Sequence, residues 1–363
     1  MDTITDVEVA SYTIPTEAPE SDGTLTWDHT TVVVVHVTAA GERGIGFTYG
    51  PGACGSIVDE VLADVVRGRD PFDVPAAWSA MVRAIRNSGR PGVCSMAIAA
   101  VDIALWDLHA KLLGLPLVRL LGAARDSVPL YGSGGFTSLS ECDLVDQLGS
   151  WVAGGFERVK MKIGTRWGRD EEADLRRVAL VREAIGGGPA LFVDANGGYS
   201  AKQSVRLARR FELSGVSWFE EPVSSDDLSG LARIRDAISI DVAAGEYGYD
   251  LAYFARMCAA GAVDVLQADV SRCAGITEWR RAAAVAAAHG LEISGHCAPS
   301  LHAHVAAATP NLAHVEYFAD HARVDRILFD GVLDPVNGAL HIDPSRPGIG
   351  LELKERDAQR FAT

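Results

Sequence analysis

Residues 216–222 read Val-Ser-Trp-Phe-Glu-Glu-Pro, and residues 242–246 read Val-Ala-Ala-Gly-Glu. Each segment is a short apolar run that leads into a carboxylate. Runs of this length that stay uncharged until their end are typical of strands buried on both faces. The pattern extends outward in both directions and recurs at 158–162, 191–196, 263–269, 291–296 and 314–316.

This repetition predicts a barrel of alternating strands and helices. A spacing of roughly 20 to 30 residues suits strand-then-helix units. In a (β/α)8-type barrel the strands are parallel, so their carboxyl ends meet at one mouth, where active sites are built. We expect the first barrel strand at 128–131 and no clear helix after Glu316. Helices are expected at 170–185, 201–213, 226–237, 250–260, 277–289 and 300–308.

The N-terminal third has a different pattern. Alternating and β-branched segments predict strands at 7–14, 30–37 and 44–49, and helices are expected within 56–88 and 91–121. A polar loop is expected over residues 16–29. We therefore predict an α/β protein with an N-terminal α+β domain, residues 1–125, completed by a C-terminal segment, residues 330–363. The barrel domain is expected to span residues 126–329.

The composition limits the classes of function. The net charge of −15 over 363 residues argues against nucleic-acid binding and against docking on an anionic membrane. The six cysteines lack CxxC spacing, which favours reduced thiols and a cytoplasmic location. We see no signal peptide, and we expect no apolar window of about 18 residues that could span a bilayer.

Three carboxylates predict a metal site. Asp194, Glu220 and Glu246 each end a predicted strand, at intervals of 26 residues. Side by side at one barrel mouth they would repel each other strongly unless a cation lay among them. All-oxygen ligation suits a hard ion such as Mg²⁺. Any one of them alone could instead form an ion pair at the mouth. Glu221 should point the opposite way along its strand, which indicates a supporting role.

Basic residues end the neighbouring strands. Lys160 and Lys162 lie two positions apart, so both face one side of their strand. Beside a bound cation the two ammonium groups would lower each other's pKa, which favours a neutral amine that can act as a base; the alternative is a solvated strand end. Asp269 and His296 end two later strands, and an Asp beside a His fixes the imidazole tautomer. Glu316 ends the last strand and could donate a proton or a hydrogen bond.

Together these motifs resemble the enolase superfamily, specifically its mandelate racemase subgroup, which includes muconate lactonizing enzymes. The resemblance covers essentially the whole chain. It rests on Lys160-x-Lys162, Asp194-x-Asn196, the Glu-Glu-Pro at Glu220, the Gly-Glu at Glu246, the pair Asp269 and His296, Glu316, and the segment 100–108.

The resemblance implies a modified TIM barrel, (β/α)7β, with an N-terminal capping domain. It also implies an essential Mg²⁺ and abstraction of the proton α to a substrate carboxylate, through an enediolate. Lys162 and His296 would stand on opposite faces of the α-carbon, with Lys160 near the carboxylate and Glu316 bonded to its other oxygen. By resemblance the protein is a homo-oligomer, a dimer or an octamer.

The subgroup contains several reactions, so the exact one stays open. The polar residues of 16–29 favour a polyhydroxy acid, and hence an acid-sugar dehydratase, a hydro-lyase that eliminates a β-hydroxyl as water; these side chains could also simply face water. Racemases or epimerases remain alternatives, and the segment 46–49 keeps a sugar-acid cycloisomerase open. The candidate substrate-binding residues are Asn196, Trp27, His29 and Tyr49.

Two alternatives lie outside this family. A glycosidase could use Glu220 and Glu246 as acid and nucleophile, but that leaves Asp194 and both lysines without a role. A non-enzymatic protein that uses the same barrel for binding or as a structural part is expected to lack at least one catalytic base or metal ligand. All of the expected bases and ligands are present in this sequence.

Overall fold

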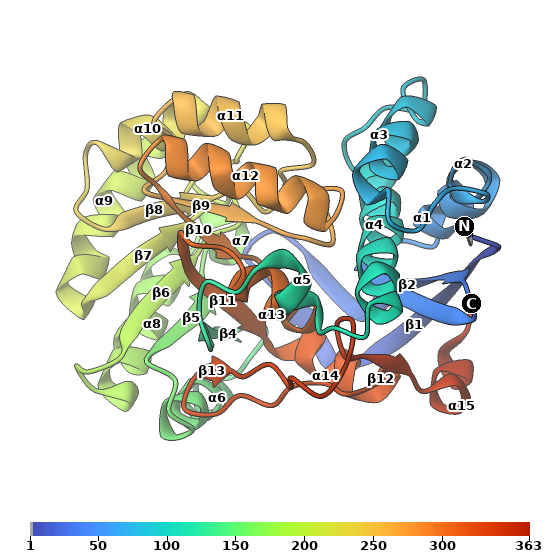
Figure 1. Ribbon diagram of the computed structural model, residues 1–363. Coiled ribbons are helices and arrows are strands. Elements are labelled where there is room, and N and C mark those ends of the chain that lie inside the picture. Colours follow the sequence, from blue (N-terminus) through green and yellow to red (C-terminus); the bar gives the residue numbers. More distant parts are fainter. Residues whose placement is uncertain (1–2) are drawn as a thin grey trace.

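A closed parallel barrel forms the larger part of the protein, which we describe from a computed structural model covering residues 3–363 (Figure 1). Its strands pair in chain order, and the last pairs with the first, which closes the sheet. The strands are β4 (Val128–Gly134), β5 (Arg158–Lys162), β6 (Ala190–Asp194), β7 (Val216–Glu220), β8 (Asp241–Ala244), β9 (Val265–Ala268), β10 (Glu292–Gly295) and β11 (Leu312–Phe318). The predicted α/β barrel is confirmed.

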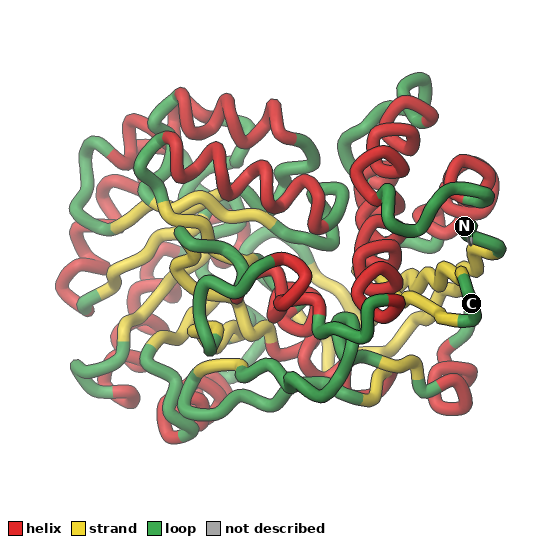
Figure 2. The backbone as a smooth tube through the Cα atoms, viewed as in Figure 1, coloured by secondary structure: helices red, strands yellow, loops and turns green. Residues whose placement is uncertain are grey.

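Helices surround the barrel on the outside (Figure 2). They are α6 (Glu141–Ala153), α7 (Thr165–Gly168), α8 (Glu171–Ile185), α9 (Ala201–Phe211), α10 (Leu228–Arg235), α11 (Leu251–Ala259), α12 (Ile276–Ala288), α13 (Pro299–Ala307) and α14 (Ala319–Leu328), with a short 3-10 turn, η2 (Glu212–Ser214), after α9.

Two of these helices correct the sequence analysis. Helix α6 was not predicted, although Ser140 caps it by accepting a hydrogen bond from the Asp143 amide, a readable start signal. The expectation that no helix follows Glu316 was wrong, because α14 begins at Ala319. Its buried face carries polar residues such as Asp320 and Asp325, so its apolar periodicity is weak in the sequence.

An antiparallel sheet of three strands and a group of helices form the capping part. The strands are β1 (Asp6–Ser21), β2 (Thr26–Ala39) and β3 (Glu42–Tyr49). The helices are α1 (Ala53–Ile57), the π-helical η1 (Val58–Leu62), α2 (Ala63–Val66), α3 (Val74–Ala84) and α4 (Val93–Leu112). The predicted polar loop at 16–29 is wrong: β1 and β2 continue as a hairpin, and Asp22 closes the turn by accepting hydrogen bonds from the Thr24 and Leu25 amides.

Helix α4 packs between the capping sheet and the barrel helices (Figure 1). By length and composition it is apolar enough to cross a membrane, contrary to our expectation that no such window exists. However, 83% of that window is buried inside the protein, as expected of a core helix that is apolar all round.

The C-terminal segment returns to the capping sheet (Figure 1). After α5 (Leu117–Leu121) has linked cap and barrel, the chain ends in β12 (Phe329–Asp330), β13 (Ala339–Leu340), β14 (Glu352–Leu353), α15 (Glu355–Ala358) and the 3-10 turn η3 (Gln359–Phe361). Strand β13 pairs with barrel strand β4, whereas the Thr363 amide donates to the Ser11 carbonyl in the cap. The proposed domain limits themselves stay a prediction.

The hairpin tip of the cap touches the barrel mouth. A Cβ atom added to Gly23 would lie 2.5 Å from the Gly164 carbonyl oxygen and 2.6 Å from that of Ile163. The Trp167 amide donates to the Gly23 carbonyl at 2.9 Å. Since Ile163 follows Lys162 directly, the tip lies beside the end of β5, and glycine permits this close approach.

Candidate active site at the barrel mouth

The strand register brings the predicted metal ligands together. Lys162, Asp194 and Glu220 are direct neighbours across β5, β6 and β7. Glu246 follows the end of β8, and the three carboxylates place ligand oxygens within 4.8 Å of one another. All three side chains are buried. Side chains that are 26 residues apart in sequence therefore share one small volume.

Glycine at position 245 makes the position of Glu246 possible. Gly245 has a φ of 138°, and a Cβ atom there would lie 1.9 Å from the Gln267 carbonyl oxygen. Neither the dihedral angle nor the space admits another residue. In the Gly-Glu pair of the sequence, the backbone conformation thus requires the glycine, and the glutamate supplies the side chain at the site.

The two lysines lie within the carboxylate cluster. Lys162 Nζ donates to Asp194 Oδ2 at 2.5 Å. Lys160, fully buried, donates to Glu220 Oε1 and lies 2.8 Å from Glu316 Oε1. Burial would lower the pKa of each lysine, but the carboxylates outweigh it, and both pKa values lie above the ordinary value. The protein's own side chains therefore raise the pKa values of both lysines, and the lowered pKa that we expected depends on a bound cation.

Supporting residues that the sequence analysis missed hold these carboxylates. Trp218 Nε1 and Gln267 Nε2 each donate to Glu220 Oε2 at 2.9 Å. Ser133 Oγ donates to Glu316 Oε1 at 2.5 Å. All three come from barrel strands and point inward, which the alternation of Trp218 with Glu220 on one strand could have indicated.

His296 is held between carboxylates. Its Nδ1 lies 2.9 Å from Asp269 Oδ2, and its Nε2 lies 3.1 Å from Glu246 Oε2 and 3.7 Å from Glu316 Oε2. The Ser271 amide and hydroxyl both donate to Asp269 Oδ1 at 2.7 Å, which fixes that carboxylate. The predicted pair of Asp269 and His296 is thus in contact, and Nε2 faces the centre of the mouth.

The surroundings shift the pKa values of this group in opposite directions. Burial would lower the pKa of His296, but the neighbouring Cys297, Glu246 and Glu316 raise it well above its ordinary value. Burial would raise the pKa of Glu316, but Lys160 and His296 hold it below its ordinary value.

The residues at the mouth fit a hard divalent cation. Any two ligand oxygens of one Mg²⁺ lie at most about 4.2 Å apart, and the three buried carboxylate oxygens lie within 4.8 Å of one another, so small side-chain movements would bring them onto one ion. Glu246 Oε2 is buried and, within residues 3–363, accepts no well-aligned hydrogen bond; His296 Nε2 lies 3.1 Å from it, and a cation would complete its partners. Asp194, Glu220 and Glu246 could therefore hold Mg²⁺, and their oxygens match its preference.

The candidate substrate-binding residues lie in different surroundings. Asn196 adjoins the site. Its backbone amide donates to Asp194 Oδ1 at 2.9 Å, and its buried side-chain Oδ1 has no partner among the described residues. Trp27 packs against Phe136 and donates to Glu20. The His29 side chain is 57% exposed and pairs with Asp28. Their roles toward substrate remain predictions.

Tyr49 lies at the contact between cap and barrel. Its ring stacks on His321, with the ring centroids 3.4 Å apart, and its hydroxyl donates to Asp325. Both partners belong to α14. A role toward substrate remains a prediction for Tyr49 as well.

A cavity of about 580 Å³ lies beside the carboxylate cluster. Its lining includes Asn196 and Glu221 from the mouth, together with Ser225, Tyr247 and other polar groups, but neither Lys162 nor His296. Glu221 is buried with a φ of 38° and has one oxygen without a hydrogen-bond partner in residues 3–363. It therefore faces the cavity beside the site, not the solvent.

Two family models match the chain. The mandelate racemase / muconate lactonizing enzyme N-terminal domain matches residues 4–122, and the enolase C-terminal domain-like family matches residues 143–358. Among curated proteins, D-galactarolactone cycloisomerase from Agrobacterium fabrum is 33% identical over 94% of both chains.

Solved structures show the same fold over the whole length. A mandelate racemase/muconate lactonizing enzyme-like protein from Rubrobacter xylanophilus has 50% identity and a TM-score of 0.96, covering 99% of this chain and 100% of that one. L-talarate/galactarate dehydratase from Salmonella typhimurium LT2, liganded with Mg and L-lyxarohydroxamate, has 30% identity and a TM-score of 0.92, covering 100% of this chain and 93% of that one.

Proposed function

Since this chain belongs to the mandelate racemase/muconate lactonizing enzyme family of the enolase superfamily, we propose that it removes the proton α to the carboxylate of a sugar acid and expels a β-hydroxyl as water. The observation that carries this proposal is the placement of two proton-transfer groups around one carboxylate cluster. Lys162 contacts Asp194 on one side, and His296 Nε2 contacts Glu246 on the other. Groups so placed can reach two faces of one carbon atom.

The chain's own residues divide the reaction between them. We assign proton abstraction to Lys162 and proton donation to the departing hydroxyl to His296, or the reverse for the opposite configuration. Asp269 holds the imidazole in one orientation through Nδ1, which leaves Nε2 to transfer the proton. Lys160 and Glu316, an ion pair, balance charge where the substrate carboxylate would lie.

Magnesium is the metal of this family, as in the liganded dehydratase structure. Asp194, Glu220 and Glu246 would hold it, and it would supply positive charge against the charge that develops on the substrate carboxylate as the α-proton leaves. Without such stabilisation the proton of a carboxylate's α-carbon is far too weakly acidic for a side-chain base to remove at neutral pH.

A polyhydroxy acid is the substrate class that we favour. The lining of the cavity beside the mouth includes hydroxyl, amide and carboxylate groups next to Pro91 and Trp167, and the polar groups suit a chain of hydroxyl groups. The dehydratase of similar fold, named for L-talarate and galactarate, is liganded with L-lyxarohydroxamate.

A sugar-acid cycloisomerase is the second candidate. The relative from Agrobacterium fabrum, a cycloisomerase, aligns over 94% of both chains, so no large insertion separates the two. Both reactions begin with the same α-proton transfer, and they differ in the group that leaves from the β-carbon.

Proton exchange in D₂O tests the shared step. A panel of mono- and diacid sugars and their lactones would be incubated with the protein and Mg²⁺, and the α-proton followed by NMR. Loss of the α-proton signal and a product that lacks one molecule of water support the dehydratase. A product of unchanged composition in which a ring has opened or closed supports the cycloisomerase, whereas an epimer of the substrate supports a racemase or epimerase. If no acid of a broad panel exchanges or reacts, the proposal fails.

Variants separate the two proton-transfer groups. We expect Lys162→Ala and His296→Asn each to abolish turnover of one epimer, with a loss of about 10² to 10⁴-fold from removing a general acid or base. Lys202→Ala, in α9, serves as the control for a lysine outside the site. Full activity in either site variant would remove that residue from the chemistry.

Chelation separates this proposal from a glycosidase. EDTA should abolish exchange, and added Mg²⁺ should restore it, whereas a glycosidase that used Glu220 and Glu246 as acid and nucleophile would survive the chelator.

We further propose a homo-oligomer, a dimer or an octamer. We place it in the cytoplasm, where the six free thiols stay reduced. Light scattering tests the assembly.

A further inference from the structure

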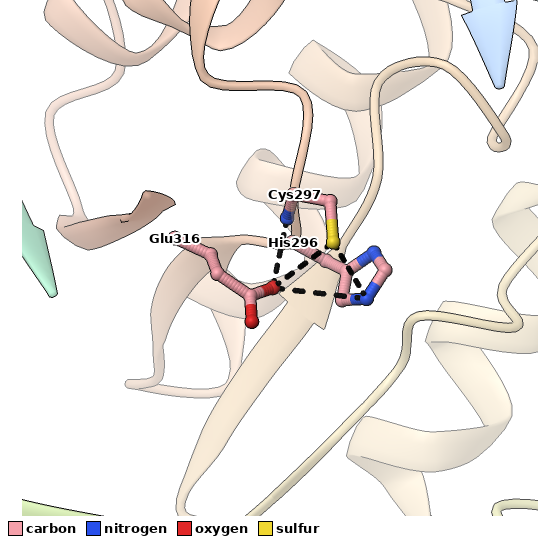
Figure 3. A group of neighbouring side chains, drawn as sticks. All are labelled: His296, Cys297 and Glu316. Atoms are coloured by element: carbon pink, nitrogen blue, oxygen red, sulfur yellow. Dashed lines mark hydrogen bonds and ion pairs between the residues drawn. The ribbon is translucent and has the colours of Figure 1, made fainter. Parts of the chain in front are cut away.

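A second cluster of metal-ligand type lies at the barrel mouth, beside the carboxylates. His296 and Cys297 follow β10, and Glu316 lies in β11 (Figure 3). Cys297 Sγ lies 3.3 Å from His296 Nε2 and 3.4 Å from Glu316 Oε2, and these two partners lie 3.7 Å apart. We name these three residues the His-Cys-Glu cluster.

These separations match the edges of a tetrahedral zinc site. With Zn–S near 2.3 Å and Zn–N and Zn–O near 2.0 to 2.2 Å, tetrahedral geometry places neighbouring ligand atoms about 3.3 to 3.6 Å apart. The three atoms therefore already form a triangle of nearly the required size. All three side chains are buried, at 4%, 4% and 1% exposure for His296, Cys297 and Glu316.

The backbone at Cys297 turns its thiol toward the imidazole. Consecutive side chains of a strand point to opposite faces. Cys297 has a φ of 49°, in the left-handed region, and this breaks the alternation so that Sγ and His296 Nε2 meet. A non-glycine residue in this region is strained and is found where the surrounding structure holds it.

Outer contacts orient each ligand atom. His296 Nδ1 is bonded to Asp269, the arrangement that steadies a zinc-bound histidine. The Cys297 amide donates to Glu316 Oε2 at 2.9 Å, and Ser133 holds the other oxygen of that carboxylate. Phe136 and Phe318 pack beside Cys297 and limit the access of water.

We propose that the His-Cys-Glu cluster binds Zn²⁺ through His296 Nε2, Cys297 Sγ and Glu316 Oε2, with water or a substrate oxygen in the fourth position. On binding, the thiol S–H bond and the imidazolium Nε2–H bond break, Zn–S and Zn–N bonds form, and the two protons pass to solvent. The thiolate selects a thiophilic ion, whereas the all-oxygen cluster of Asp194, Glu220 and Glu246 suits Mg²⁺. One mouth thus offers two sites of different metal preference.

Zinc in this cluster would inhibit the enzyme. The ion takes the Nε2 lone pair of His296 that proton transfer needs, so Mg²⁺-supported exchange should stop at the face served by His296. This consequence rests on the proposed function, whereas metal binding itself does not.

Cobalt titration tests the binding. Co²⁺ replaces Zn²⁺ as a visible probe and is added to the full-length protein in saturating Mg²⁺, in a Cys142→Ser background that removes the exposed thiol. We expect a thiolate-to-cobalt charge-transfer band that saturates at an equimolar amount and is displaced by Zn²⁺. Cys297→Ser in this background should lose the band and weaken zinc binding more than about 100-fold, beyond what loss of an outer contact costs.

Each outcome decides the proposal. No band in the Cys142→Ser protein, or an unchanged band after Cys297→Ser, overturns it. Should Cys297→Ser fail to fold, His296→Asn replaces it, and a band of unchanged affinity in that variant likewise overturns the site. Zinc inhibition, measured for each protein relative to its own zinc-free exchange rate, should disappear with Cys297→Ser. If the cobalt band forms but no acid exchanges its α-proton, the zinc site is supported and only the proposed function is refuted.

Discussion

The substitution Gly23→Ala tests whether the cap hairpin positions the barrel mouth. The new Cβ atom would lie 2.5 Å from the Gly164 carbonyl oxygen, whereas ordinary contact begins at 3.4 Å. The hairpin and the segment after β5 must therefore separate by at least about 0.5 Å, and by about 0.9 Å to restore ordinary contact, because both sides of the contact are backbone. The hydrogen bond from the Trp167 amide to the Gly23 carbonyl lengthens with this movement.

Two measurable effects follow from the displacement. Overpacking of this kind lowers the free energy of unfolding by about 1 to 3 kcal/mol. Since Ile163 and Gly164 directly follow Lys162, a shift of about 1 Å at this point should slow α-proton exchange by up to about 10²-fold. Urea denaturation measures the first effect, and NMR exchange in D₂O measures the second.

A matched glycine supplies the control. Gly149 lies within α6, where an added Cβ atom meets nothing within 4 Å. Gly149→Ala should raise the free energy of unfolding by about 0.5 to 1 kcal/mol and leave exchange unchanged. If Gly23→Ala behaves like Gly149→Ala in both assays, the hairpin tip does not position the mouth and the reasoning is refuted.

Further predictions concern buried charges. Lys160→Met should lower the free energy of unfolding in urea by about 3 to 5 kcal/mol, because Glu220 and Glu316 lose their buried counter-ion; a loss below 1 kcal/mol would contradict this. Burial raises the pKa of Asp102 to about 7, although hydrogen bonds from Thr277 oppose the shift. The folded state then binds a proton that the unfolded chain, with an aspartate pKa near 3.9, releases, so the stability from this group is lost as the pH rises from about 4 to 7. Asp102→Asn should flatten that decline in urea titrations over this range, and parallel curves for the two proteins would be evidence against it.

The strand register explains why some site residues could be predicted from the sequence and others could not. Asp194, Glu220 and Glu246 were predictable because parallel strands carry their carboxyl ends to one mouth, whatever lies between them. The supporting residue Gln267 was missed because its contact with Glu220 depends on the barrel register, whereas the inward orientation of Trp218 could have been predicted from its alternation with Glu220 on one strand.

The segment 16–29 and helix α14 also could not be predicted from local sequence. The segment 16–29 was expected to be a loop because it is polar, yet pairing with the neighbouring strand extends β1 and β2 through most of it. Helix α14 was missed because its buried face carries acids that are paired across the interface, such as Asp325 with Tyr49. Tertiary partners, not local apolar periodicity, stabilise both elements.

By itself the sequence determined the parallel barrel and the family, because a charged residue at the end of each apolar run is a local pattern that survives any loop geometry. Only the tertiary structure decided that Cys297 turns its thiol onto His296 and Glu316 and that Gly23 abuts the strand of Lys162. Distances of a few ångströms between residues far apart in the chain arise from strand register and backbone dihedral angles, and neither is encoded in the spacing of residue types.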